Sequence, residues 1–363
     1  MPPRERETTT ETEFEWEEIR RHDKDGDAWV VLRGGVYNVS NFLKDHPGGG
    51  SIVMPHLGGD IEEVFADEDY HEHSKAAYKI LEQYRIGHLA GTASVASGKT
   101  TAHSSVDGGA DVDGEVADID WTKPIVMQVG KLGKRYNEFV HDPVVLDEPA
   151  RFFGPDWMEP FSRTSWWVIP GVWGPVICGG FLYSIKLGLT PVEAACSLAA
   201  GVAVWTWLEY VLHRFVFHLD EAVQFSWWSI TLHFLLHGVH HKLPQDPMRL
   251  VMPPVITAII LIPVYHFFSF LAKCFCQLHL PVAITLTCGG LLGYVGYDLT
   301  HYYLHHAGIS PDSYIGKLKR YHMAHHYQNP KLGFGITSKF WDRIFGTVLH
   351  VKEGRSKAAV KTE

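Results

Sequence analysis

Long apolar stretches are confined to the last two thirds of the chain. Four of them, at residues 166–187, 190–212, 251–273 and 278–299, are each close to the length of a membrane span. A helix of about 20 apolar residues crosses the hydrocarbon core of a bilayer, and the prolines that interrupt several of these stretches are tolerated there. Buried helices of a soluble protein are the alternative. Four such stretches with Trp and Tyr near their ends favour four transmembrane helices.

The rest of the apolar pattern divides the chain into further parts. Residues 14–90 have the mixed composition of a compact domain, which follows an acidic tail. Residues 91–120 are rich in Gly, Ser, Thr, Ala and Asp, a composition typical of a flexible linker. We therefore expect a compact module at 14–90, a linker at 91–120, a membrane domain at 121–350 and a basic tail at 351–363.

The charge is as unevenly distributed as the apolar residues. Residues 1–120 contain 25 acidic and 11 basic residues, and residues 121–363 contain 16 and 21, so the two parts carry net charges of −14 and +5. The basic part would favour an anionic membrane leaflet. No basic run with interleaved aromatic residues indicates a nucleic-acid partner. The five cysteines form no paired framework, which favours a reducing compartment, and the first 20 residues contain no apolar core of a secretory signal.

The positions of Lys and Arg predict the membrane topology. Basic residues are frequent before the first apolar stretch, between the second and third, and after the fourth. The two other loops contain only Lys186 and Lys273. Because cytosolic loops carry an excess of Lys and Arg, both termini are expected in the cytosol.

Histidines are concentrated in four short boxes. Of the 23 histidines, 15 lie between His213 and His350. The boxes are HRFVFH, HFLLHGVHH, HYYLHH and HMAHH, and their ten candidate metal ligands are His213, His218, His237, His240, His241, His301, His305, His322, His325 and His326. Residues three or four apart share one face of a helix, so imidazoles within a box are expected to reach a common metal. All four boxes fall at the predicted cytosolic side, the first in the loop after the second apolar stretch. Clustering of this kind outweighs the alternative that each is an ordinary structural histidine.

Two histidine positions leave alternatives open. His213 and His218 are five residues apart, so on an ideal helix they point about 140° away from each other. A helix end or an unwound turn at residues 214–217 would reconcile them. His233 shares a face with His237 and His241, and it is either an additional ligand or a residue that supports one.

Two carboxylates lie close to box histidines. Glu209 and Asp298 precede a box histidine by four and three residues, so either could orient a ligand imidazole or be a helix-surface carboxylate. His306 breaks the face shared by His301 and His305. The remaining histidines of this region, His266, His279 and His350, are isolated and are expected to be structural.

The motif DHPGGG at Asp45–Gly50 and the later segment HEHSKAAYKILEQYRIGHL mark the N-terminal module. Together with WVVLRGGVYNVSNFLKD, they resemble the cytochrome b5 family over residues 14–90. The resemblance implies an α+β fold that binds haem b, with His46 and His73 as axial ligands. Two histidine ligands would leave no open iron position, so the haem would transfer electrons. Expected pocket residues are Val39, Phe42, Leu57 and Phe65. The alternative is that HPGG is only a tight turn.

The histidine boxes resemble those of the membrane fatty acid hydroxylase superfamily over residues 125–350, most closely the fatty acid 2-hydroxylases of sphingolipid metabolism. The sequences that carry this are EYVLHRFVFH, HFLLHGVHHKLPQDPMRLVMPP, YDLTHYYLHH and YHMAHHYQNPKLGFGITSKFWDRIFGT. The resemblance implies an all-α integral membrane domain with a cytosolic histidine-rich cap. It also implies a dimetal centre with five imidazoles for each ion, in the endoplasmic reticulum membrane. The metal would be non-haem iron, for which zinc can substitute in a purified sample.

These resemblances predict 2-hydroxylation of long or very long acyl chains, in free fatty acids or ceramides, with dioxygen as co-substrate. The fused haem would supply electrons, and a separate NADH-dependent cytochrome b5 reductase would reload it, because the chain contains no FAD or NAD motif. One alternative is a sterol or sphingoid-base hydroxylase or desaturase of the same superfamily. Another is a non-enzymatic membrane electron carrier or metal transporter.

Overall fold

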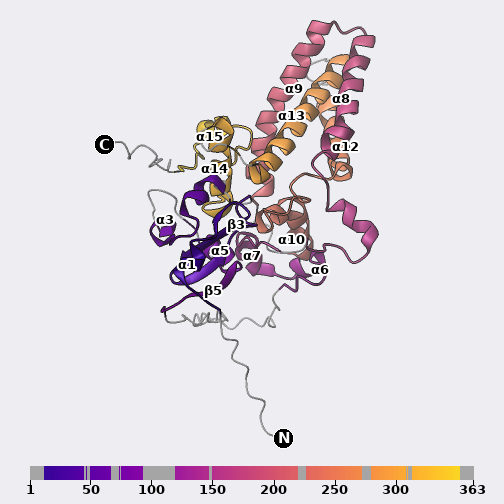
Figure 1. Ribbon diagram of the computed structural model, residues 1–363. Coiled ribbons are helices and arrows are strands. Elements are labelled where there is room, and N and C mark those ends of the chain that lie inside the picture. Colours follow the sequence, from indigo (N-terminus) through magenta and orange to yellow (C-terminus); the bar gives the residue numbers. More distant parts are fainter. Residues whose placement is uncertain are drawn as a thin grey trace, which may run out of the picture. The chain divides into compact units, whose positions relative to one another are not determined.

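The computed structural model describes residues 12–44, 46, 50–66, 73, 75–92, 119–146, 149–219, 226–271, 279–307, 309 and 313–351. Most of the predicted linker and nearly all of the predicted basic tail lie outside the described residues. The chain divides into an N-terminal unit and a second unit, Ala117–Val351, and Figure 1 shows the elements of both. Each unit is described by itself.

The N-terminal unit contains a five-stranded sheet in the order β1-β5-β4-β3-β2. The strands are β1 (Glu13–Phe14), β2 (Asp23–Lys24), β3 (Asp27–Leu32), β4 (Gly35–Asn38) and β5 (Arg85–Leu89). A two-residue turn joins β3 to β4, with positive φ angles of 52° at Arg33 and 78° at Gly34. Two positive φ angles match the right-handed twist of the paired strands, which explains the RGG sequence at this point.

Short helices cover the core of this unit. They are α1 (Trp16–Ile19), α2 (Gly50–Val53), the 3-10 turn η1 (Met54–His56), α3 (Glu62–Ala66) and α5 (Lys75–Glu82). Successive side chains of a strand face opposite sides of a sheet. Accordingly, Ala28, Val30 and Leu32 of β3 join the larger hydrophobic cluster, whereas Val31 joins a second one. The N-terminal unit is therefore an α+β domain with its own core.

Three helices of the second unit are long and apolar enough to cross a membrane, counting only the described residues. They are α8 (Val168–Lys186), α9 (Pro191–Leu212), which continues to Phe217 as the π-helical turn η4 (His213–Phe217), and α13 (Leu280–His306). They lie side by side in Figure 1. The third predicted stretch forms α12 (Pro254–Leu271). Of its described residues, only the first part, Pro254–Pro263, counts as an apolar helix, and this part by itself is too short to cross a membrane. The structure thus supports three of the four predicted spans.

Two glycines allow α9 and α13 to pack closely. A Cβ atom on Gly201 would lie 2.2 Å from the carbonyl oxygen of Leu286, and one on Gly289 would lie 2.1 Å from that of Leu198. No side chain fits at such distances. Close backbone approach is a common basis of helix association in membranes, so this contact fixes the spacing of the two helices that carry the first and third histidine boxes.

The remaining helices are short and gather at one end of the long ones (Figure 1). They are α6 (Val126–Val129), η2 (Gly133–Arg135), α7 (Tyr136–Val140), η3 (Asp156–Phe161), α10 (Trp227–His233), the π-helical turn η5 (Phe234–Gly238), α11 (Val239–Lys242), α14 (Tyr314–Tyr327) and α15 (Phe340–Phe345). A buried apolar cluster that includes Val129, Tyr136, Phe152 and Phe234 joins α6, α7 and η5 to the segment before α8. This packing holds the second histidine box against the ends of α9 and α13.

Candidate metal centre

Nine box histidines form two clusters of ring nitrogens. In each cluster, one nitrogen from every member lies within 4.8 Å of the others. The first cluster contains His240, His301, His305, His322 and His326, and the second contains His213, His218, His241 and His325. The tenth, His237, lies beside the second cluster, with its Nε2 3.3 Å from His218 Nε2. The structure therefore brings all ten predicted residues together, five in the first cluster, four in the second, and His237 next to the second.

The boxes do not map one-to-one onto the clusters. In the second box His240 belongs to the first cluster and His241 to the second, and in the fourth box His326 belongs to the first and His325 to the second. Neighbouring residues on a helix point about 100° apart, so each HxxHH box can reach two sites. The imidazoles of these two boxes are therefore divided between the two clusters and do not all face one site.

A widened helical turn resolves the spacing of the first box. Instead of ending in a loop, α9 continues as the π-helical turn η4, in which His218 N donates to His213 O across 3.2 Å. The extra residue in this turn brings the Nε2 atoms of His213 and His218 to 3.2 Å. The second box contains a π-helical turn as well, η5. Such turns are rare and frequently lie at functional sites.

Nine of the ten box imidazoles are buried, and His218 is partly exposed. Burial is the largest cause that lowers the pKa of His240, His322 and His326 well below the usual value, and neighbouring histidines lower it further. A neutral imidazole has one nitrogen lone pair free to bind a metal. Among the described residues, neither ring nitrogen of His240 or His241 has a hydrogen-bond partner. Buried polar atoms without partners are costly, which a bound cation would offset.

The distances between nitrogens fit shared metal ions. His322 Nε2 lies 3.0, 2.9 and 3.0 Å from the Nε2 atoms of His301, His305 and His326. Neutral imidazole nitrogens have either one proton or one lone pair, so at most one of these contacts is a hydrogen bond. Nitrogens about 2.1 Å from one ion are about 3.0 Å apart when the angle at the ion is a right angle and about 3.4 Å apart at the tetrahedral angle. The donor set and spacing thus fit a metal in each cluster.

Backbone carbonyls orient two of the second cluster's imidazoles. His213 Nδ1 lies 2.6 Å from Phe334 O, and His325 Nδ1 lies 2.7 Å from Leu332 O. A donating Nδ1–H leaves the Nε2 lone pair pointing into the cluster. The acceptor segment is itself held by Asp342, which accepts from Phe334 N at 3.0 Å and from Gly335 N at 2.8 Å. Sequence reasoning missed these roles, because they depend on contacts between distant segments.

A histidine outside the boxes also adjoins the second cluster. His141 lies at the end of α7, and its ring centroid is 5.3 Å from that of His241 and 6.2 Å from that of His218. The sequence gave no indication that His141 lies beside the second cluster, because it is an isolated histidine about 70 residues before the first box.

His233 is a supporting residue rather than a ligand. Its Nδ1 lies 2.6 Å from Tyr136 Oη, and its Nε2 lies 2.6 Å from Phe217 O. Because the carbonyl can only accept, Nε2–H donates to Phe217 O and Nδ1 accepts from Tyr136. With both ring nitrogens engaged, the ligand alternative for His233 is wrong. The residue holds the end of η4, next to His218.

Both carboxylates near the boxes are buried, so the helix-surface alternative is wrong for each. Asp298 Oδ2 accepts from Met252 N at 3.1 Å and from Tyr294 Oη at 3.0 Å, and Glu209 accepts from Thr337 Oγ1. In the described part of the chain, neither hydrogen-bonds a box histidine, which argues against the expectation that they orient a ligand. They instead connect α9 and α13 to neighbouring segments and line a cavity.

A cavity of about 860 Å³ adjoins the histidine clusters. His237, His240 and His301 line one part of it, and the rest of its lining comes from α9, α12 and α13 together with residues 152–162 and 249–253 and the two π-helical turns. Most of that lining is apolar, and includes Leu208, Leu212, Ile256, Leu261, Leu286 and Leu291. A largely apolar cavity with few polar groups is typical of a small-molecule site, and this one fits a lipid chain.

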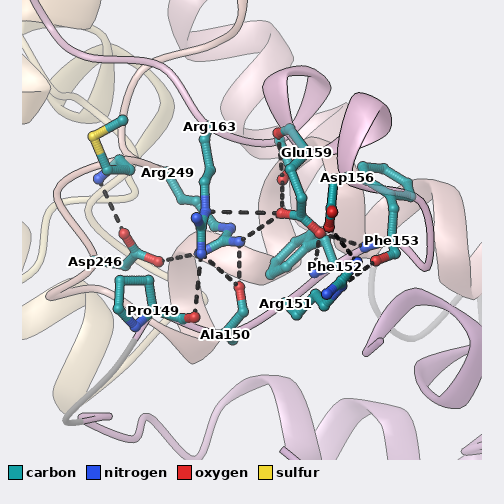
Figure 2. Close-up of polar contacts among 12 residues, drawn as sticks. Pro149, Ala150, Arg151, Phe152, Phe153, Asp156, Glu159, Arg163, Asp246 and Arg249 are labelled. Carbon is teal, nitrogen blue, oxygen red and sulfur yellow. Dashed lines mark hydrogen bonds and ion pairs between the residues drawn. The ribbon is translucent and has the colours of Figure 1, made fainter. Parts of the chain in front are cut away.

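A buried ion-pair network fixes the wall of the cavity beside segment 149–163. Figure 2 shows the guanidinium group of Arg249 between the carboxylates of Asp246 and Glu159. The Arg249 side chain is 1% exposed, donates to Ala150 O, and lies over the Phe152 ring, 3.9 Å from its centroid. Glu159 accepts from Phe152 N at 2.8 Å. The network thereby ties the loop after the second box to the segment that precedes α8.

Replacing Arg249 is expected to destabilise the second unit. Arg249→Met leaves the buried carboxylate of Asp246 without its ion-pair partner and leaves Glu159 with Arg163 alone, so we expect a loss of about 3 kcal/mol. The matched control is Arg151→Met, because the Arg151–Asp156 pair is 46% and 91% exposed and is worth no more than about 1 kcal/mol. Thermal unfolding of the detergent-solubilised protein measures both. Equal shifts in the two variants would contradict a special role for the buried network.

The two predicted haem ligands face each other in the N-terminal unit. The ring centroids of His46 and His73 are 6.4 Å apart, and nitrogens about 2 Å from a shared metal place two imidazoles at roughly this separation. His73 Nδ1 lies 3.1 Å from Phe65 O, which leaves Nε2 to face His46. The predicted pocket residues Val39, Phe42, Leu57 and Phe65 all belong to one hydrophobic cluster. This arrangement fits a haem held by two histidines.

The fold and the clusters define a membrane protein with a polyhistidine centre beside a lipid-sized cavity and a separate α+β domain. Comparisons with known proteins agree. Residues 15–90 match the model of the cytochrome b5-like heme/steroid binding domain, and residues 198–347 match that of the fatty acid hydroxylase family. A solved structure described as full-length scs7p, with only its hydroxylase domain visible, is 40% identical, with a TM-score of 0.59 over 65% of this chain and 87% of that one.

Curated relatives cover both parts of the chain. The ceramide very long chain fatty acid hydroxylase SCS7 of Saccharomyces cerevisiae is 36% identical over 93% of this chain and 94% of its own. The human fatty acid 2-hydroxylase is 36% identical over 92% and 95%. The dihydroceramide fatty acyl 2-hydroxylase FAH2 of Arabidopsis thaliana is 45% identical over 66% and 97%. The chain belongs to the fatty acid 2-hydroxylase family, and the resemblance inferred from its motifs is confirmed.

Proposed function

We propose that the protein hydroxylates the carbon next to the carbonyl group of long or very long acyl chains, in free fatty acids or in ceramides. The observation that carries this proposal is that three box histidines, His237, His240 and His301, line the apolar cavity between the membrane helices. An acyl chain in this cavity would have its polar end at the histidine clusters. The names of the relatives support the same reaction class.

The ten box histidines would hold two non-haem iron ions, five imidazoles for each, with zinc as a substitute in purified samples. When bound, the ions would supply the oxidising chemistry that inserts one oxygen atom of dioxygen into an unactivated C–H bond. The chain orients the imidazoles through Phe334 O and Leu332 O, and it excludes water by burying the clusters. The apolar lining would hold the acyl chain so that the carbon beside the carbonyl lies at the clusters.

The electrons would come from the N-terminal unit. The facing pair His46 and His73 supports haem b with two axial histidines, which leaves the iron fit for electron transfer. A separate NADH-dependent cytochrome b5 reductase would reload the haem. The proposed domain boundaries are those expected from the sequence: a haem domain at residues 14–90, a linker at 91–120, a hydroxylase domain at 121–350 and a tail at 351–363.

The membrane arrangement is part of the proposal. Three helices support membrane spanning, and α12 would be the fourth span. The distribution of Lys and Arg supports a topology with both termini and the histidine clusters in the cytosol, and the family supports residence in the endoplasmic reticulum.

Lipid analysis tests the proposal. Expressed in cells that lack a 2-hydroxylase, the chain is expected to produce 2-hydroxy acyl lipids, which mass spectrometry detects. His237→Ala removes an imidazole from the cavity wall and should reduce this product at least a hundredfold. A hydroxylated or desaturated sterol or sphingoid base, formed without 2-hydroxy acyl chains, would instead establish the alternative substrate class.

A further inference from the structure

One face of α13 forms a continuous wall of the cavity. The residues of α13 on this wall are Leu286, Thr287, Gly290, Leu291, Tyr294, Tyr297, Asp298 and His301. Most are three or four positions apart, which places them on one side of a helix. The wall therefore runs from a histidine of the first cluster, His301, along the helix to Thr287 and Leu286.

Gly290 leaves a gap in this wall. A Cβ atom at Gly290 would have its nearest neighbour, Gly201 O, at 3.9 Å, an ordinary van der Waals contact, so a Cβ fits there without strain. The adjacent Gly289 differs, because a Cβ there would lie 2.1 Å from Leu198 O. Helix packing thus requires glycine at 289 but not at 290. Without a side chain, position 290 leaves room in the cavity.

We infer that Gly290 determines how long an acyl chain the cavity accepts. Gly290 lies 11 residues from His301, or about 16 Å along the helix at 1.5 Å per residue. A carbon–carbon bond of about 1.5 Å gives an extended chain about 1.25 Å per carbon, so roughly 13 carbons separate the reacting carbon from this position. The inference rests on the proposed function, since it takes the acyl chain as the occupant.

The other walls are consistent with a chain lying along α13. Val204 and Trp205 of α9 and Ile260 and Tyr265 of α12 line the cavity as well. Val204 and Ile260 are 49% and 43% exposed, and the cavity that they line is partly open. A chain entering from the bilayer would lie against the wall of α13, where Gly290 is the position without a side chain.

The test fills the gap and compares chain lengths. Cells expressing Gly290→Leu are given saturated fatty acids of 12 to 26 carbons, and mass spectrometry measures each 2-hydroxy product. We expect products from 12- and 14-carbon chains at wild-type levels and products from 24-carbon chains at least tenfold lower. Thr287 lies 14 residues from His301, or about 21 Å along the helix at 1.5 Å per residue. Thr287→Phe should therefore lower only the 2-hydroxy products of chains that have more than about 17 carbons beyond the reacting carbon.

Gly296→Leu is the matched control. Gly296 lies on the same helix, a Cβ there meets nothing within 4 Å, and it is exposed and does not line the cavity. Metal content of the purified variants reports correct folding, and Gly290→Ala, whose Cβ fits, should show a smaller shift in the same direction. The inference is wrong if Gly290→Leu and Gly296→Leu give the same distribution of products over chain length. It is also wrong if Gly290→Leu lowers the products of all chain lengths equally. A wild-type chain that forms no 2-hydroxy product would instead overturn the proposed function.

Discussion

Replacing His322 with alanine is expected to abolish hydroxylation, by at least a thousandfold. His322 Nε2 lies within 3.0 Å of the Nε2 atoms of three other members of the first cluster. Its loss removes one imidazole and leaves a buried void where the remaining nitrogens face each other. The first cluster should therefore lose its metal, whereas the second, which contains His325 from the same helix, keeps its full set of imidazoles.

The measurement pairs product formation with metal analysis of the purified variant. The metal content of His322→Ala should fall by about one ion for each chain. His279→Ala is the control, since His279 is an exposed residue at the other end of α13 and belongs to neither cluster. Full activity in His322→Ala would contradict a catalytic role for the first cluster.

The second large effect concerns the N-terminal unit. His46→Ala or His73→Ala removes one of the two facing imidazoles, so the haem absorbance band should disappear in the oxidised and reduced protein. Hydroxylation should fall at least tenfold because the electrons no longer arrive, while the metal content of the second unit stays unchanged.

His22→Ala is the control within the same unit. His22 stacks on Trp29, with 3.7 Å between ring centroids, and it pairs with Asp27 rather than facing His46 or His73. This variant should keep the haem band and the activity. Undiminished hydroxylation in His73→Ala, with the haem lost, would show that electrons reach the second unit from another source.

Local pattern was enough to predict the main elements. The second and fourth apolar stretches correspond to α9 and α13, and the structure places nine of the ten box histidines in two adjacent clusters, with His237 beside the second. These predictions succeeded because hydropathy over a membrane span and three-to-four-residue spacing on a helix are properties of neighbouring residues.

The remaining features depend on contacts between distant segments. Helical spacing alone cannot predict the π-helical turn that unites His213 with His218, because the turn is stabilised where His233 binds Phe217 O. Likewise, His141 and Asp342 acquire their roles from the packing of α7 and of the segment before α15 around the clusters. Glu209 and Asp298 are buried where Thr337 and Met252, from segments distant in the sequence, hydrogen-bond to them, which hydropathy does not reveal.

The number of metal ions bound by the wild-type chain tests the central claim most directly. Elemental analysis of the detergent-purified protein, with haem iron determined separately from its absorbance, counts the non-haem iron and zinc. Two imidazole clusters with ten histidines predict two such ions for each chain, whichever of the two metals is present. A value of one ion or none, in protein that forms 2-hydroxy acyl lipids, would contradict the account.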